Sequence, residues 1–251
     1  MHRRHALKFL AGFALCPLCA ARGVASEVHW SYEGATGPDK WSGLDAADAP
    51  CSAGGQQSPI DITGTISARQ PPLKINWPKR PHTMINNGHT IQLNFAEGGT
   101  LHMGDRRYAL QQLHFHHPSE HLVQGKRFAM EAHFVHAADD GLAVVGVLMV
   151  AGKPNGVFKR IVSTMPSEEG PAIPADPAFD PSRLLPAQRA YYHYEGSLTT
   201  PPCSETVDWI VLAHPIEVDD ADIARFAKLY PMNARPVQKR DRRFILSSGP
   251  S

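Results

Sequence analysis

Hydrophobic and polar residues alternate over much of the middle of the chain. Short stretches rich in β-branched and aromatic residues are separated by Gly, Pro and Asn, which is typical of closely spaced β-strands. The pattern predicts strands over 90–95, 108–116, 128–136 and 142–150, with turns near 98–99, 125 and 140–141.

Helical periodicity is clear in only two places, 155–164 and 220–230, where Asp219 or Asp220 can cap the second helix. Many close strands and few helices favour a mostly antiparallel sheet over alternating strand and helix units. We therefore predict a mainly β protein with a large, central, twisted, mostly antiparallel sheet and a few short peripheral helices. No linker divides it, so 27–251 is predicted to form a single domain.

Composition narrows the range of partners. The chain has 251 residues, of which 42% are hydrophobic, which is enough to bury a substantial core. Its 25 basic and 24 acidic residues give a net charge of +1, so no long-range field attracts nucleic acid or an anionic membrane. Histidine stands out, at 14 residues.

The N-terminus has the pattern of a cleaved export signal over 1–26. A basic start is followed by the apolar run 9–21 and then by small residues, and cleavage is expected near Ser26. The apolar run is too short for a stable membrane anchor in a bilayer core of about 30 Å. Arg3 and Arg4 resemble a twin-arginine signal, and a plain secretory signal stays equally open. We predict a periplasmic or secreted protein.

Cys51 and Cys203 remain once this segment is removed. An even pair of cysteines in an oxidising compartment predicts a disulfide, with two buried free thiols as the alternative. No Cys-x-x-Cys pair remains, so the sequence offers no support for a thiolate zinc site or a dithiol redox enzyme.

Three histidines lie at positions that suit a metal centre. Side chains two apart in a strand share a face, so Gln112, His114 and His116 point the same way, as do Glu131 and His133 in the next predicted strand. A hairpin between the strands brings the three imidazoles together. Three neutral imidazoles with an open fourth position are typical of catalytic Zn²⁺. Gln112 and Glu131 are placed to accept hydrogen bonds from the other ring nitrogens. Ordinary core or surface positions are predicted for His102, His117, His136, His193 and His214.

Several motifs resemble the alpha carbonic anhydrases, in particular the bacterial periplasmic type. The resemblance runs in family order over nearly the whole chain after the leader. It rests on Gln57-Ser-Pro-Ile-Asp-Ile62, Asn86-Asn-Gly-His89, Gln112-Leu-His-Phe-His116, Ser119-Glu-His121, Glu131-Ala-His133, Gly196-Ser-Leu-Thr-Thr-Pro-Pro202, Asp208-Trp-Ile-Val-Leu212 and Asn233-Ala-Arg-Pro236.

The resemblance implies a zinc-dependent lyase that reversibly hydrates carbon dioxide to bicarbonate and a proton. In that family a zinc-bound hydroxide attacks carbon dioxide. Thr199 would accept a hydrogen bond from the hydroxide and donate its own proton to Glu120, while Thr200 would contact bicarbonate or pocket water. His89 would carry the proton between the site and buffer.

The same resemblance assigns the surroundings of the site. Five residues match the family's carbon dioxide pocket: Val135, Val144, Leu198, Val207 and Trp209. Three others match the polar lining of the proton path: Tyr32, Asn87 and Gln92. Inhibition by sulfonamides and small anions is implied, as is a monomer or a homodimer.

Two alternatives remain open. One is a zinc-binding module of the same fold that has lost turnover, although none of the expected ligands is missing. The other is a cupin-type metalloenzyme, because His114-x-His116 followed by Glu120 imitates part of a cupin motif. A cupin would use Glu120 as a metal ligand and would bind iron or manganese.

Overall fold

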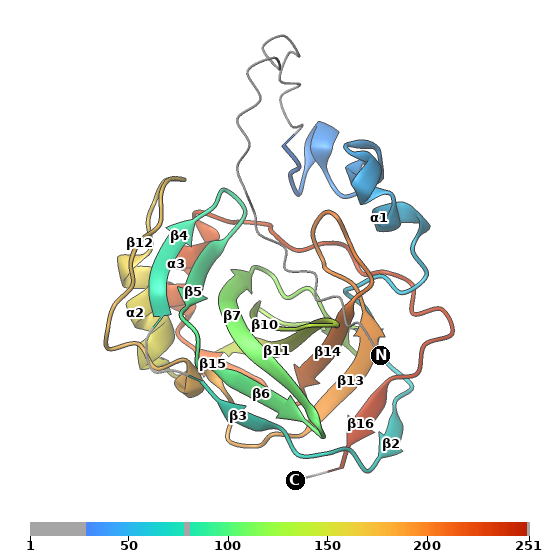
Figure 1. Ribbon diagram of the computed structural model, residues 1–251. Helices are drawn as coiled ribbons and strands as arrows, with labels where there is room; N and C mark the ends of the chain where they lie inside the picture. The colour runs from blue at the N-terminus through green and yellow to red at the C-terminus, as the bar shows by residue number, and fades with distance from the viewer. Residues whose placement is uncertain (1–28, 78–80, 250–251) are drawn as a thin grey trace, which may run out of the picture.

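β-Strands dominate the computed structural model, which describes residues 29–77 and 81–249 (Figure 1). The predicted export signal, 1–26, lies outside these residues. Within the described ranges, no helix combines the length and apolar character needed to cross a bilayer.

The N-terminal part of the described chain consists of short helical turns, and the strands follow. The helices are η1 (Gly34–Thr36), η2 (Trp41–Gly43), η3 (Ala46–Asp48), α1 (Pro50–Ala53), α2 (Gly156–Thr164), η4 (Pro181–Leu184) and α3 (Asp220–Ala227). The strands are β1 (Asp61–Ile62), β2 (Ile66–Ala68), β3 (Lys74–Asn76), β4 (Pro81–Asn86), β5 (Ile91–Phe95), β6 (Thr100–Met103), β7 (Arg106–His116), β8 (Leu122–Val123), β9 (Lys126–Arg127), β10 (Met130–Ala138), β11 (Gly141–Ala151), β12 (Ile173–Pro174), β13 (Tyr191–Gly196), β14 (Val207–Leu212), β15 (Ile216–Val218) and β16 (Leu246–Ser248).

One large sheet of 13 strands organises the molecule. Its main order is β12-β4-β5-β7-β10-β11-β14-β13-β16-β2; in addition, β15 pairs with β11, β6 pairs with β7, and β3 pairs with β6. Most neighbours are antiparallel, but β14 and β15 both pair parallel with β11, and β2 pairs parallel with β16. The predicted mainly β fold is confirmed, and the sheet is mixed at its centre.

The predicted elements agree closely with the observed ones. The four predicted strands are β5, β7, β10 and β11, and each boundary is within two residues of its prediction. Helix α2 begins after Asn155, whose side chain accepts hydrogen bonds from the backbone N–H groups of Val157 and Phe158. Helix α3 begins after Asp219, which caps it in the same way, and ends at Ala227, three residues earlier than predicted.

The two faces of the sheet bury different clusters. On one face, Phe115 of β7 packs against Phe158 of α2 and Phe226 of α3, with ring centroids 5.5 and 6.1 Å apart. Figure 1 shows α2 and α3 together beside β4 and β5. Because side chains alternate along a strand, His114 and His116 lie on the face opposite Phe115. Helices α2 and α3 therefore cover the face of the sheet that carries Phe115, and not the face that carries His114 and His116.

A disulfide joins Cys51 of α1 to Cys203, in the loop between β13 and β14. The predicted disulfide is thus present. It packs with Trp41 in a small cluster that ties the N-terminal helical turns to this loop.

Candidate metal centre

Three imidazoles converge where β7 and β10 pair. In this antiparallel ladder His133 lies opposite His114, and Glu131 lies opposite His116. One ring nitrogen from each of His114, His116 and His133 lies within 4.8 Å of the other two. The structure therefore brings together the three histidines that the strand pattern placed on one face.

Each of these imidazoles has an acceptor for its second ring nitrogen. Gln112 Oε1 lies 2.8 Å from Nδ1 of His114, and Glu131 Oε1 lies 2.9 Å from Nε2 of His133. The backbone carbonyl of Asn233 lies 2.7 Å from Nδ1 of His116. These acceptors select the tautomers in which lone pairs remain on Nε2 of His114, Nε2 of His116 and Nδ1 of His133.

Sequence reasoning missed Asn233 as a partner of His116. Its carbonyl comes from a loop far along the chain, and a backbone oxygen leaves no signature in residue type. The only available signal was the Asn233-Ala-Arg-Pro236 motif.

Burial keeps the three rings neutral. It lowers the pKa of His114 well below its ordinary value, with further lowering from the neighbouring histidines. It lowers the pKa of His116 to about 4, and it also lowers the pKa of His133, against an opposing effect of Glu131. The neutral imidazole is the form that binds metals.

The arrangement has the chemistry of a cation site. Nε2 of His116 is fully buried, and among the described residues it has no hydrogen-bond partner. An imidazole lone pair in this position, aimed at the same point as two others, suits a metal ion. An all-nitrogen set of three neutral imidazoles fits zinc, which favours nitrogen and sulfur ligands. The residues present therefore fit the predicted Zn²⁺.

Glu131 accepts hydrogen bonds from His133 and from two residues of the loop behind it. Its Oε1 accepts from Nδ1 of His121 (2.8 Å) as well as from His133, and its Oε2 accepts from the backbone N–H groups of Glu120 (3.0 Å) and His121 (2.9 Å). Burial alone raises the pKa of Glu131, but His121 and His133 outweigh it and hold that pKa well below the usual range. His121, Glu131 and His133 also lie close enough to hold a metal, but the facing ring nitrogens donate to the carboxylate, so they form a hydrogen-bond network.

Glu120 lies beside the converging nitrogens. Its Oε1 accepts from the backbone N–H of Arg235 at 2.8 Å, and its Oε2 lies 3.5 Å from Nε2 of His116 and 3.9 Å from Nδ1 of His133. Burial raises the pKa of Glu120 to about 7, and His133, the Arg235 N–H and the Thr199 hydroxyl each act to lower it. A divalent cation nearby would further favour the ionised carboxylate. Glu120 is not part of the three-histidine group, which counts against its use as a ligand.

The predicted substrate-pocket residues lie together. Three of them, Val144, Val207 and Trp209, belong to one buried cluster, and Val135 and Leu198 pack against it. The parallel pairing of β11 with β14 sets Val144 opposite Trp209, and the Trp209 ring is 4.9 Å from that of His133. An apolar wall therefore adjoins the metal ligands. Thr199 is buried and Thr200 half-buried in the loop that follows Leu198.

His89 is stacked against aromatic neighbours. Its ring lies 3.6 Å from that of Trp30, nearly parallel to it, and 4.6 Å from that of His29. Burial, with a smaller contribution from His29, lowers the pKa of His89 to about 4. In this position the ring is neutral at physiological pH. Its role as a proton carrier stays a prediction.

The other predicted lining residues mostly support local structure. Asn87 Oδ1 accepts from the backbone N–H groups of His89 (3.0 Å) and Thr90 (2.9 Å), which shapes the turn before β5. Gln92 donates to Asn94 at 2.7 Å. Tyr32 packs in the cluster around the disulfide, with its ring 6.5 Å from that of His89.

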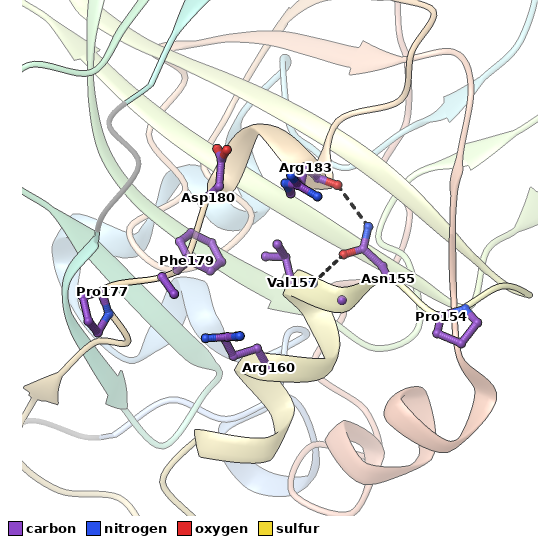
Figure 2. Close-up of a pocket in the computed structure, with 10 residues that line it drawn as sticks. Pro154, Asn155, Val157, Arg160, Pro177, Phe179, Asp180 and Arg183 are labelled. Atoms are coloured by element: carbon purple, nitrogen blue, oxygen red, sulfur yellow. Dashed lines mark hydrogen bonds between the residues drawn. The ribbon is translucent and has the colours of Figure 1, made fainter.

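A surface cavity of about 790 Å³ lies beside the start of α2 (Figure 2). Figure 2 shows Asn155 at its wall, accepting from Val157 N and donating to the carbonyl of Arg183. No residue of the three-histidine group or its hydrogen-bond partners lines this cavity. It is therefore separate from the candidate metal centre.

Taken together, the fold and the three histidines define a mixed-sheet protein with a candidate mononuclear metal centre. The profile described as "Eukaryotic-type carbonic anhydrase" matches residues 36–249. A carbonic anhydrase of Neisseria gonorrhoeae is 41% identical over 92% of both chains, and one of a Nostoc species is 40% identical over 99% of this chain and 98% of the relative. The alpha-carbonic anhydrase of Thermovibrio ammonificans, solved in complex with the inhibitor sulfanilamide, superposes with a TM-score of 0.85 at 39% identity, covering 87% of this chain and 98% of that one.

These matches cover most of the chain. The protein belongs to the eukaryotic-type carbonic anhydrase family, also called the alpha class.

Proposed function

We propose that the protein is a zinc-dependent carbonic anhydrase that catalyses the reversible hydration of carbon dioxide to bicarbonate and a proton. One observation carries the proposal. In a chain of this family, three neutral imidazoles aim their lone pairs at one point while their other ring nitrogens are held by Gln112, Glu131 and the Asn233 carbonyl.

His114, His116 and His133 would hold the zinc. When bound, zinc lowers the pKa of a coordinating water to about 7, as it does in carbonic anhydrases, and so supplies a nucleophile at neutral pH. The ligands need no deprotonation to bind it, because their lowered pKa values already keep them neutral.

Thr199 and Glu120 orient the nucleophile. An ionised Glu120 accepts a hydrogen bond from the Thr199 hydroxyl, which leaves the Thr199 oxygen free only to accept. Thr199 would therefore accept a hydrogen bond from the nucleophile and leave a lone pair of the nucleophile free to face carbon dioxide. The Arg235 N–H, 2.8 Å from Glu120 Oε1, holds the carboxylate for this task.

The apolar wall binds carbon dioxide, which is small and has no charge. Val135, Val144, Leu198, Val207 and Trp209 form this wall, and Thr200 contacts the bicarbonate that forms.

His89 carries the product proton to buffer. In the stack with Trp30 its pKa of about 4 makes it a poor acceptor, so we expect the ring to leave the stack, where its pKa returns towards 6.5. Tyr32, Asn87 and Gln92 order water along this path.

The remaining proposals concern the setting of the enzyme. We propose that an export signal over 1–26 is removed near Ser26, that 27–251 is one domain, and that the enzyme works in the periplasm or outside the cell, as a monomer or homodimer. Sulfonamides should inhibit it, since the Thermovibrio ammonificans relative is described with such an inhibitor.

The two alternatives have less support. A cupin is excluded by membership of the carbonic anhydrase family. A zinc-binding module without turnover would be expected to lack a ligand or the Thr199 and Glu120 pair, and this chain has them all.

The test is stopped-flow carbon dioxide hydration by the mature protein before zinc removal, after it, and after zinc is restored. Activity should disappear and return with the metal. His114→Ala should abolish it, whereas the matched His102→Ala, away from the site, should leave it unchanged. Activity that survives without zinc would overturn the mechanism, and a zinc-loaded protein with no activity would favour the module.

A further inference from the structure

A chain of buried hydrogen bonds continues outward from Glu131. His121, whose Nδ1 bonds to Glu131, has its Nε2 2.6 Å from the hydroxyl of Tyr194. The Tyr194 hydroxyl is also hydrogen-bonded to Oγ of Ser58, 3.0 Å away. Starting from metal ligand His133, the path therefore runs through Glu131, His121 and Tyr194 to Ser58.

The same path reaches the loop that carries Thr199. Oγ of Ser58 accepts from the backbone N–H of Ser197 (3.1 Å), and the backbone N–H of Ser58 donates to Oγ of Ser197 (2.9 Å). Ser197 lies two residues before Thr199, and its carbonyl accepts from Trp209 Nε1 at 3.0 Å. One hydrogen-bonded chain thus connects His133 to Ser197, which belongs to the same loop as Thr199.

Every member of this chain is sealed from water. Ser58, His121, Glu131 and Ser197 are fully buried, and the exposed fraction of Tyr194 is 1%. Inside a protein such bonds are strong, and removing one partner leaves a buried polar atom that water cannot satisfy. Each bond of the chain is therefore costly to break, because no solvent is present to replace a lost partner.

Two glycines make room for this chain. A Cβ atom at Gly146, the residue opposite His133 on β11, would lie 2.9 Å from Oε1 of Glu131. A Cβ atom at Gly196 would lie 2.2 Å from Oγ of Ser58 and 2.9 Å from the Tyr194 ring. Both contacts are too close for any larger residue. The backbone is therefore shaped around both ends of the chain.

We propose that Tyr194, acting with His121 and Ser58, is a positioning residue that couples the orientation of metal ligand His133 to the loop that carries Thr199. The inference rests on the proposed function. It assigns the buried Tyr194 hydroxyl a role in zinc retention and turnover, although this hydroxyl touches neither metal nor substrate.

The test uses three variants of the zinc-loaded enzyme: Tyr194→Phe, Ser58→Ala and the double variant. Two quantities are measured, the rate of zinc loss to a chelator and kcat/KM for carbon dioxide hydration. Tyr108→Phe is the matched control. The side chain of Tyr108 is as little exposed as that of Tyr194, and its variant loses a 2.6 Å, partly buried hydrogen bond to Asp208 that involves none of the metal ligands.

Removing the direct partner of a metal ligand typically costs about 10–100-fold in metal affinity. Tyr194 lies two hydrogen bonds behind the direct partner Glu131, so Tyr194→Phe should speed zinc loss by about 10-fold, the low end of that range, and lower kcat/KM. Ser58→Ala should act in the same direction by a smaller factor. The double variant should match Tyr194→Phe within about two-fold, because the path is already cut at Tyr194. Tyr108→Phe should lose stability but keep the wild-type rate of zinc loss.

Two results would overturn the proposal. One is that both single variants keep the rate of zinc loss and kcat/KM within two-fold of wild type. The other is that the effects of Tyr194→Phe and Ser58→Ala multiply in the double variant, as independent losses of stability would. If Tyr194→Phe does not fold, Ser58→Ala against Tyr108→Phe decides alone. The wild-type measurements test the proposed function separately, since an inactive or zinc-indifferent wild type would refute that function.

Discussion

Replacing Glu131 by glutamine would change one atom of the site and reverse half of its hydrogen bonding. The carboxylate accepts four hydrogen bonds, two at each oxygen: from the rings of His121 and His133 at Oε1, and from the backbone N–H groups of Glu120 and His121 at Oε2. A glutamine amide has one oxygen and one NH₂ group. Whichever way it is placed, its NH₂ group faces two donors.

The size of the effect follows from this count. Two buried N–H groups lose their acceptors, and each unsatisfied group costs about 1–3 kcal/mol, or about 2–6 kcal/mol in total. The variant no longer buries a carboxylate, which offsets part of this, so we expect the free energy of unfolding to fall by about 3 kcal/mol. With its Nε2 no longer held, His133 should bind zinc about 10–100-fold more weakly.

Urea unfolding of the zinc-free protein and competition with a zinc chelator would measure the two effects. Glu217→Gln, at an exposed carboxylate of β15, is the matched control and should change neither. If Glu131→Gln kept the wild-type urea midpoint and bound zinc within three-fold of wild type, the role given to these four hydrogen bonds would be wrong.

Three further predictions concern pH, redox state and proton transfer. Burial lowers the pKa of His136 to about 4, so the folded state favours the neutral ring. In the unfolded state the ring has a pKa near 6.5 and is protonated first as the pH falls. The free energy of unfolding should therefore decrease by up to about 3 kcal/mol between pH 6.5 and 4. His136→Gln should flatten that slope in urea unfolding, and an unchanged slope would contradict the assignment. Reducing the Cys51–Cys203 disulfide, which closes a separation of 152 residues, should lower the free energy of unfolding by at most about 5 kcal/mol and reduce activity, and a reduced enzyme with the oxidised urea midpoint would disprove this. Trp30→Ala should raise the pKa of His89 from about 4 towards 6.5 in an NMR titration, because the ring regains water; a pKa that stayed near 4 would show that stacking is not the cause.

The sequence pattern correctly predicted the features that depend only on residues close together in the chain. Alternation along a strand follows from backbone geometry, so it correctly placed His114 and His116 opposite Phe115 and assigned Gln112 and Glu131 to the ligand face. Helix boundaries were also readable, because Asn155 and Asp219 satisfy the first N–H groups of their own helices. The end of α3 was less well predicted, since no comparable residue marks it.

The amino-acid sequence by itself determined the two strands that carry the three histidines, β7 and β10, and the histidines that share a face. Through its motifs it also determined the family. Only the tertiary structure decided which distant groups complete the site: the Asn233 carbonyl, the Arg235 N–H, the Tyr194 hydroxyl and the parallel pairing of β11 with β14. It also decided that His89 stacks on Trp30 with a lowered pKa. The reason is physical: periodicity and capping depend on neighbours in the chain, whereas strand register, burial and contacts between backbone and side chains across the chain depend on how the whole core packs.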